Sequence, residues 1–166
     1  LSFFSGIASA IAGNHLLVAM ALGIAPVSEV TGAALYAFSI GEPWLIVPAT
    51  IANMLVSPAL LLLWEALNIS YWGKKILGKH LEKRMHEVGH KYDKYGTLGI
   101  AVFIAIPIIP GTGAYTGTLI GELLDLKRSH IILGSTLGVL ITAIMMYAGL
   151  AFAPEFARSV LALKPF

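Results

Sequence analysis

Cysteine is absent from the sequence, and charged residues are scarce. Only 12% of the 166 residues are charged, whereas 57% are apolar. Without cysteine the chain can form no disulfide and use no thiol chemistry. So low a charge content lies far from the average of soluble domains and indicates a membrane protein. We expect no nucleic-acid partner, no cofactor and no enzymatic activity.

Long stretches of the chain carry no charge at all. The charge-free runs cover residues 1–28, 30–41, 43–64, 96–121 and 129–154. A helix needs about 20 apolar residues to cross a bilayer. The runs therefore predict one transmembrane domain over residues 1–166, with three spanning helices at Phe3–Ile24, Trp44–Glu65 and His130 to about Phe152.

Polar and helix-breaking residues interrupt these predicted spans. Asn14 and His15 fall inside the first span, where we expect interhelical hydrogen bonds or a lining of a transport path. Pro48 and Pro58 fall inside the second and predict kinks. Gly134 and Gly138 in the last span form a G-x-x-x-G pattern, which is typical of close helix packing.

A run of prolines and glycines breaks the fourth charge-free stretch. Proline lacks the N–H donor and glycine weakens a helix, and broken backbone survives in hydrocarbon only where protein shields it or a polar cavity adjoins it. As one helix, residues 97–125 would extend about 43 Å, against a hydrocarbon core of about 30 Å. We therefore predict a re-entrant hairpin of two half-helices. Its breaking residues are Pro107, Pro110, Gly111, Gly113 and Gly117.

A similar pattern precedes the second predicted span, where Pro26, a hydroxyl residue and Gly32 lead into a short apolar stretch. Thr31-Gly32 recurs as Thr116-Gly117, 85 residues later. This predicts a repeat, with copies at about 25–65 and 96–152. Each copy would hold a re-entrant hairpin and a spanning helix. Since one helix separates the hairpins, they should enter from opposite faces, an inverted arrangement common in secondary transporters.

Basic residues gather in one segment. Residues 74–95 hold seven of the eleven Lys and Arg residues, opposite an apolar stripe with helical spacing. This predicts an interfacial amphipathic helix over about 68–95. The positive-inside rule puts that segment and Lys127-Arg128 in the cytoplasm of a multi-pass protein of the plasma membrane.

The same segment contains the zincin pattern H-E-x-x-H as His86-Glu87-Val88-Gly89-His90. In a metalloprotease, the two histidines of this pattern bind zinc and the glutamate acts as general base. The charged flanks and the missing third histidine favour a solvated helix face instead. A membrane zinc protease, and metal binding by His86 and His90 without catalysis, remain alternatives.

Pro26-Val-Ser-Glu-Val-Thr-Gly32 and Ala105-Ile-Pro-Ile-Ile-Pro-Gly-Thr-Gly-Ala-Tyr-Thr-Gly117 carry a family resemblance. Together they resemble the small multidrug export protein family, which is distantly similar to the DedA superfamily of membrane proteins with two facing re-entrant hairpins. The resemblance to DedA implies transport of lipids or polyprenyl phosphates. Family members often carry arginine where this chain has Thr31, and no Lys or Arg occurs between Lys94 and Lys127. Backbone N–H groups of Gly111–Ala114, at a half-helix N-terminus, would then have to hold an anion.

Glu29 is the carboxylate flanked by long apolar runs and next to a predicted turn. An ionisable residue at membrane depth is expensive and points to function, although a solvated turn residue would give the same pattern. Desolvation would favour its neutral form, which suits proton coupling. We expect Glu29 to face the second hairpin. The predicted substrate and proton path comprises Glu29, Thr31, Gly32, Pro107, Pro110, Gly111, Thr112, Gly113, Tyr115, Thr116 and Gly117.

The sequence thus predicts an all-α polytopic secondary transporter. It would move a lipid or lipid-like anion in a proton-coupled cycle, as a DedA-like flippase or scramblase would. The alternative within transport is a small multidrug exporter of hydrophobic cations. Expected partners are membrane lipids, an amphipathic substrate and protons, and a homo-oligomer is left open.

Overall fold

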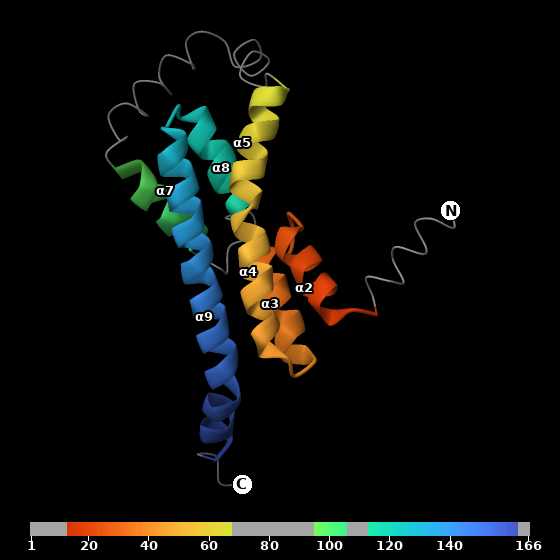
Figure 1. The fold of residues 1–166 in the computed structure, drawn as a ribbon. Coiled ribbons are helices and arrows are strands. Elements are labelled where there is room, and N and C mark those ends of the chain that lie inside the picture. Colours follow the sequence, from red (N-terminus) through yellow and green to blue (C-terminus); the bar gives the residue numbers. More distant parts are fainter. Residues whose placement is uncertain (1–12, 68–94, 106–112, 163–166) are drawn as a thin grey trace.

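The computed structural model describes residues 13–67, 95–105 and 113–162, with side chains up to Ala153 (Figure 1). Every regular element in these residues is a helix, as the sequence predicted. The elements are α2 (His15–Ile24), α3 (Glu29–Ser39), the 3-10 turn η1 (Pro43–Leu45), α4 (Ile46–Met54), α5 (Val56–Ala66), α7 (Gly96–Ile104), α8 (Ala114–Leu123) and α9 (Arg128–Ala162).

Two long helical rods run side by side in opposite directions (Figure 1). Pro43–Ala66, which joins η1, α4 and α5, and Arg128–Ala153 within α9 are each long and apolar enough to cross a membrane. Two pairs of short helices pack on these rods towards opposite ends. The pair α2 and α3 contacts α4, and the pair α7 and α8 contacts α9.

The first helix is shorter than predicted. A continuous helix over Phe3–Ile24 is wrong, because α2 begins at His15 and Asn14 has extended backbone angles. The Asn14 side-chain oxygen accepts hydrogen bonds from the backbone N–H groups of Leu16 and Leu17, at 3.0 and 3.3 Å. Asn14 is therefore an N-cap that satisfies orphan donors at a helix start, not an interhelical partner inside a span.

The helix formed by α4 and α5 is interrupted at Leu55. Pro58 cannot donate to the carbonyl of Met54, four residues earlier, so a break one turn before Pro58 follows from its chemistry. Pro48 causes no such break because it lies in the first turn of α4, where N–H groups have no helical partner. Of the two predicted kinks, the one at Pro58 is confirmed.

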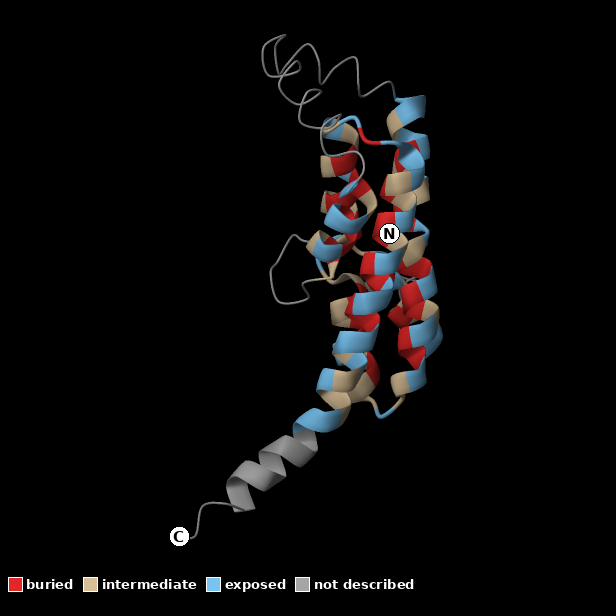
Figure 2. Cartoon of the chain, turned by 90° about the vertical axis from the view of Figure 1, so that its left-hand side faces the viewer, coloured by how far each residue is buried: buried red, intermediate tan, exposed pale blue. Residues whose placement is uncertain are grey.

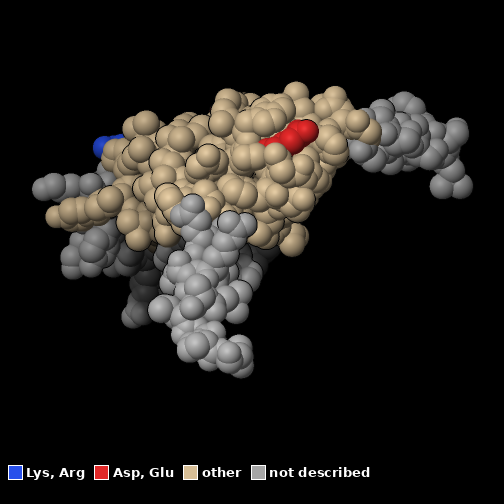
Figure 3. All heavy atoms as spheres, turned by 90° about the horizontal axis from the view of Figure 1, so that it is seen from below, with Lys and Arg blue, Asp and Glu red and all other residues tan. Residues whose placement is uncertain are grey.

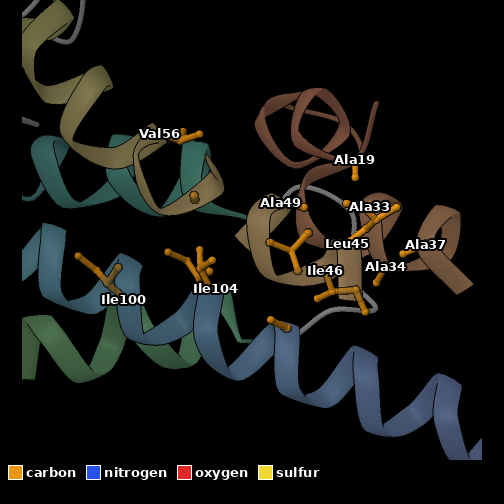
Figure 4. Close-up of a cluster of buried hydrophobic side chains, with 14 of the residues drawn as sticks. Ala19, Ala33, Ala34, Ala37, Leu45, Ile46, Ala49, Val56, Ile100 and Ile104 are labelled. Atoms are coloured by element: carbon orange, nitrogen blue, oxygen red, sulfur yellow. The ribbon is translucent and has the colours of Figure 1, made fainter. Parts of the chain in front are cut away.

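Small residues let these helices approach closely. A Cβ atom on Gly138 would lie 2.8 Å from the carbonyl oxygen of Ala101, and one on Gly134 would lie 2.6 Å from that of Thr97. The predicted G-x-x-x-G packing face is thus confirmed, with α7 as its partner. Alanines fill the core between α2, α3 and α4 (Figure 4), and buried residues face inward on all the packed helices (Figure 2).

The outer ends of each short helix pair lie together. The His15 ring nitrogen Nδ1 is 2.6 Å from the Tyr36 hydroxyl, which links the start of α2 to the last turn of α3. A Cβ atom on Gly96, at the start of α7, would lie 3.2 Å from the side chain of Leu126, which follows α8. Each pair therefore leaves one end of the molecule and returns to the same end. The predicted interfacial helix at 68–95 lies almost wholly outside the described residues.

Candidate functional site

The site is built around a hydrogen bond between the two short helix pairs. The backbone N–H of Ala114, the first residue of α8, donates to Glu29 Oε2 at 3.0 Å. Glu29 is itself the first residue of α3 and has a φ of 46°, in the left-handed region that non-glycine residues rarely adopt. Both helix N-termini favour a negative charge. The carboxylate therefore lies where two helix dipoles stabilise it.

Gly113 leaves the space that the carboxylate fills. A Cβ atom at this position would overlap both oxygens of the Glu29 carboxylate. Any other residue would displace the carboxylate or the backbone of α8. Glycine is thus required here for close approach, not for an unusual backbone angle, since its φ is −85°.

Three successive carbonyls at the end of α2 each accept a hydrogen bond from a different side chain. Ser28 Oγ donates to the carbonyl of Leu22 at 2.7 Å. Asn53 Nδ2 donates to that of Gly23, and the Tyr115 hydroxyl donates to that of Ile24, both at 2.5 Å. These carbonyls lack partners within the helix. Side chains from the turn after α2, from α4 and from α8 thereby fix this helix end beside Glu29.

The Asn53 side chain is fully buried. Its Nδ2 is committed to Gly23, and among the described residues no donor reaches its Oδ1. One turn further along, buried Ser57 receives a hydrogen bond from buried Thr118 at 2.9 Å. Polar side chains thus lie along the Pro43–Ala66 rod, where Asn53 bonds to α2 and Ser57 bonds to α8.

An apolar groove of about 230 Å³ adjoins this centre. Tyr115 is its one hydroxyl-bearing lining residue, and the same hydroxyl closes the hydrogen bond to Ile24. The groove is lined by Ile24, Ala52, Leu55, Val56, Ala59, Leu60, Leu63 and Tyr115. It can hold a hydrophobic body, whereas the carboxylate beside it can hold a positive charge.

Charged residues gather at the far end of the rods. Arg128 at the start of α9 forms ion pairs with Glu65, at 2.6 Å, and with Glu122, at 3.4 Å. Arg128 and Glu65 are largely exposed, so their pair contributes little to stability. The Glu122 side chain, by contrast, is only 12% exposed. Seen from the opposite end, most of the described surface is uncharged, with acidic atoms towards one side and basic atoms only at the far edge (Figure 3).

The predicted site residues have different outcomes. Glu29 does face the segment that begins at Gly113, as predicted, and accepts a hydrogen bond from the backbone N–H of Ala114. The helix N-terminus predicted to hold an anionic substrate holds this carboxylate. Gly117 packs against Ile104, 2.6 Å from where its Cβ would be, and Gly32 packs against Ser28 within the turn. Thr31 and Thr116 are half-buried.

Several predicted residues fall outside the described part of the chain. These are His86, His90, Pro107, Pro110, Gly111 and Thr112. Conversely, Asn53, Ser57 and Thr118 were not singled out from the sequence. The sequence did mark these residues, because each is a polar residue in a charge-free apolar run.

The family model described as "Putative small multi-drug export protein" matches residues 16–145. This range includes all of the described elements except the first residue of α2 and the end of α9. No curated protein and no solved structure matches the chain. The predicted similarity to the DedA superfamily stays a prediction.

Proposed function

Because the chain belongs to the small multi-drug export protein family, we propose that it exports small hydrophobic cations across a membrane in exchange for protons. The observation that carries this proposal is the Glu29 carboxylate between two helix N-termini and next to an apolar groove. Residues 1–73 contain no Lys or Arg that could neutralise it. A proton or a cation would therefore supply the counter-charge at Glu29.

The proposed topology treats α2 with α3, and α7 with α8, as re-entrant hairpins that enter from opposite faces. The meeting of the outer ends of each pair supports this arrangement, as does the position of the two pairs on oppositely directed rods. The hairpin turns would then meet near the midplane, where protein shields their broken backbone. We place Lys127 and Arg128, together with the basic segment 74–95, in the cytoplasm at the plasma membrane.

A transport assay on proteoliposomes tests the function. The vesicles are loaded with a hydrophobic ammonium, and the solution outside them is made more acidic than the lumen. This pH gradient should drive the ammonium out of the lumen through the wild-type chain. Glu29→Gln should abolish this movement, because the amide can neither release a proton nor balance a cation. Glu42→Gln, a change at a half-buried carboxylate just before η1, is the matched control and should transport like the parent. Wild-type transport by Glu29→Gln would sink the proposal.

The second candidate is the lipid-like anion predicted from the sequence. It is favoured by the N-terminus of α8, whose N–H groups can hold an anion once Glu29 withdraws or is neutralised. The two candidates predict opposite signs for Glu29→Gln. A cation carrier loses its counter-charge, whereas an anion carrier loses a repelling charge and should bind its substrate more tightly. Measuring both ligand classes on this variant separates them.

A further inference from the structure

We propose that the ligand reaches Glu29 from the lipid phase through the apolar groove, and that the hydrogen bond from Tyr115 to Ile24 is the gate at the inner end of this route. The inference rests on the proposed function and adds the source of its substrate, a hydrophobic compound dissolved in the bilayer. It depends on where the groove opens and on which residues close it.

The groove opens on a part of the surface that would face lipid. Ile24, Leu55 and Leu63 line it, and these residues are 46%, 63% and 54% exposed. Leu55 and Leu63 belong to the Pro43–Ala66 rod, which is long and apolar enough to cross a membrane. In a bilayer their exposed faces would meet hydrocarbon. None of the lining residues is charged, so the groove suits an apolar group that comes from the hydrocarbon and not a hydrated ion.

The inner end of the groove lies next to Glu29, although Glu29 is not a lining residue. Tyr115 lines the groove, and its neighbour Ala114 donates a backbone N–H to the Glu29 carboxylate at 3.0 Å. Ile24 also lines the groove, and the carbonyl of its neighbour Ala25 accepts from the backbone N–H of Glu29 at 2.9 Å. Among the described residues, Tyr115 and Ile24 therefore form the boundary between the groove and the carboxylate.

A hydrogen bond closes this boundary. The Tyr115 hydroxyl donates to the carbonyl of Ile24 at 2.5 Å, and the Tyr115 side chain is only half-buried. Ser28 and Asn53 bond the two preceding carbonyls of α2 and do not line the groove. These two contacts can hold the end of α2 in place while the Tyr115 side chain turns away. Opening the gate therefore breaks one hydrogen bond and leaves the rest of the site in position.

The test measures how fast Glu29 reacts with dicyclohexylcarbodiimide, a lipid-soluble reagent for protonated carboxyl groups, on the full chain in lipid nanodiscs. Mass spectrometry of the peptide that contains residue 29 locates the modification, and Glu29→Gln is the blank. Tyr115→Phe should react about three to ten times faster, because opening no longer breaks a hydrogen bond. Tyr36→Phe is the matched control and should react like the wild type. It removes the hydroxyl that bonds His15 at the outer end of α2.

Ala59→Phe tests the groove itself. Ala59 is an exposed lining residue, so a larger side chain there fills the groove without entering the core. The lipid-soluble reagent should then react several-fold more slowly, whereas a charged, water-soluble carbodiimide should react at its wild-type rate. In the wild-type chain the lipid-soluble reagent should be the faster of the two.

An unchanged rate in Tyr115→Phe, or an equal rise in Tyr36→Phe, overturns the gate. The route is overturned by an unchanged rate in Ala59→Phe, by faster reaction of the wild-type chain with the water-soluble reagent, or by no reaction at Glu29 in any chain. The comparison of the two reagents needs no substitution, so the test stands even if a variant does not fold. Because the labelling requires no transported cation, failure of the inference leaves the vesicle assay of Glu29→Gln intact, and failure of the proposed function shows in that assay alone.

Discussion

Glu29 and Ala114 hold equivalent positions in the two predicted copies of the repeat, and a hydrogen bond joins them. They are 85 residues apart, the same shift that aligns Thr31-Gly32 with Thr116-Gly117. Each is the first residue of a short helix, α3 or α8. One copy thus supplies a carboxylate where the other supplies only a backbone N–H. Among the described residues, the contact between the starts of α3 and α8 therefore holds the carboxylate of one predicted copy and no charged side chain from the equivalent position of the other.

Gly113→Ala should disable the site without altering Glu29. The added methyl group would overlap the carboxylate, which must then leave the N–H of Ala114. We expect the loss of cation transport seen for Glu29→Gln, measured in the same vesicles. Gly99→Ala on α7 is the control, since nothing lies within 4 Å of its added Cβ. Normal transport by Gly113→Ala would show that the carboxylate need not rest on α8.

Cysteine labelling should reveal the re-entrant arrangement. Because the chain contains no cysteine, single cysteines can be introduced without first removing native ones. Single cysteines at Tyr95 and Ser129 should react with a membrane-impermeant thiol reagent from one side, and a cysteine at Gly41 from the other. The reason is that α7 and α8 return to the end from which they start. Labelling of Tyr95 and Ser129 from opposite sides would mean that residues 96–126 cross the membrane.

The buried pair of Ser57 and Thr118 should couple α5 to α8. Removing either hydroxyl, in Ser57→Ala or Thr118→Val, should cost about 0.5–1.5 kcal/mol of unfolding free energy. Because the hydroxyls bond each other at 2.9 Å, the double variant should cost less than the two single variants together. Thermal denaturation in detergent measures this cycle. Strict additivity would show that the contact adds nothing to stability.

Gly138→Ala should destabilise the packing of α7 on α9. Its Cβ would lie 2.6 Å from the Ile104 Cβ and 2.8 Å from the carbonyl oxygen of Ala101, so backbone must shift, at a cost of about 1–3 kcal/mol. Gly149→Ala, on the same helix with open space around it, should be neutral or stabilising by up to about 1 kcal/mol. Thermal denaturation of the two variants side by side provides the comparison. Equal melting temperatures would contradict the prediction.

The coarse features of the fold could be predicted from composition and periodicity. Apolar runs located the two long rods, because length and hydropathy alone decide whether a helix can cross a bilayer. The start of α2 could not be located this way. Hydropathy does not distinguish an asparagine that caps a helix from one inside it, and Asn14 is preceded by a run of apolar residues that continues the pattern.

The site was predicted in part, for a related reason. Glu29 stood out as an isolated charge, and the repeat indicated which segment it would face. Its hydrogen-bond partner could not be named in advance, because every residue except proline carries a backbone N–H and no residue type marks the one at position 114. The role of Asn53 depends on the carbonyl of Gly23, thirty residues away, and that contact exists only in three dimensions.

The interruption at Leu55 gives the Pro43–Ala66 rod a point at which it can bend. Below it, α4 packs on the first helix pair, and above it, α5 packs on α8. Asn53 and Ser57, which contact opposite halves of the molecule, lie two residues to either side. Because Pro58 has removed the hydrogen bond to the carbonyl of Met54, bending at this point costs less than it would in an unbroken helix. The same proline that shortens a helix thus makes bending there inexpensive.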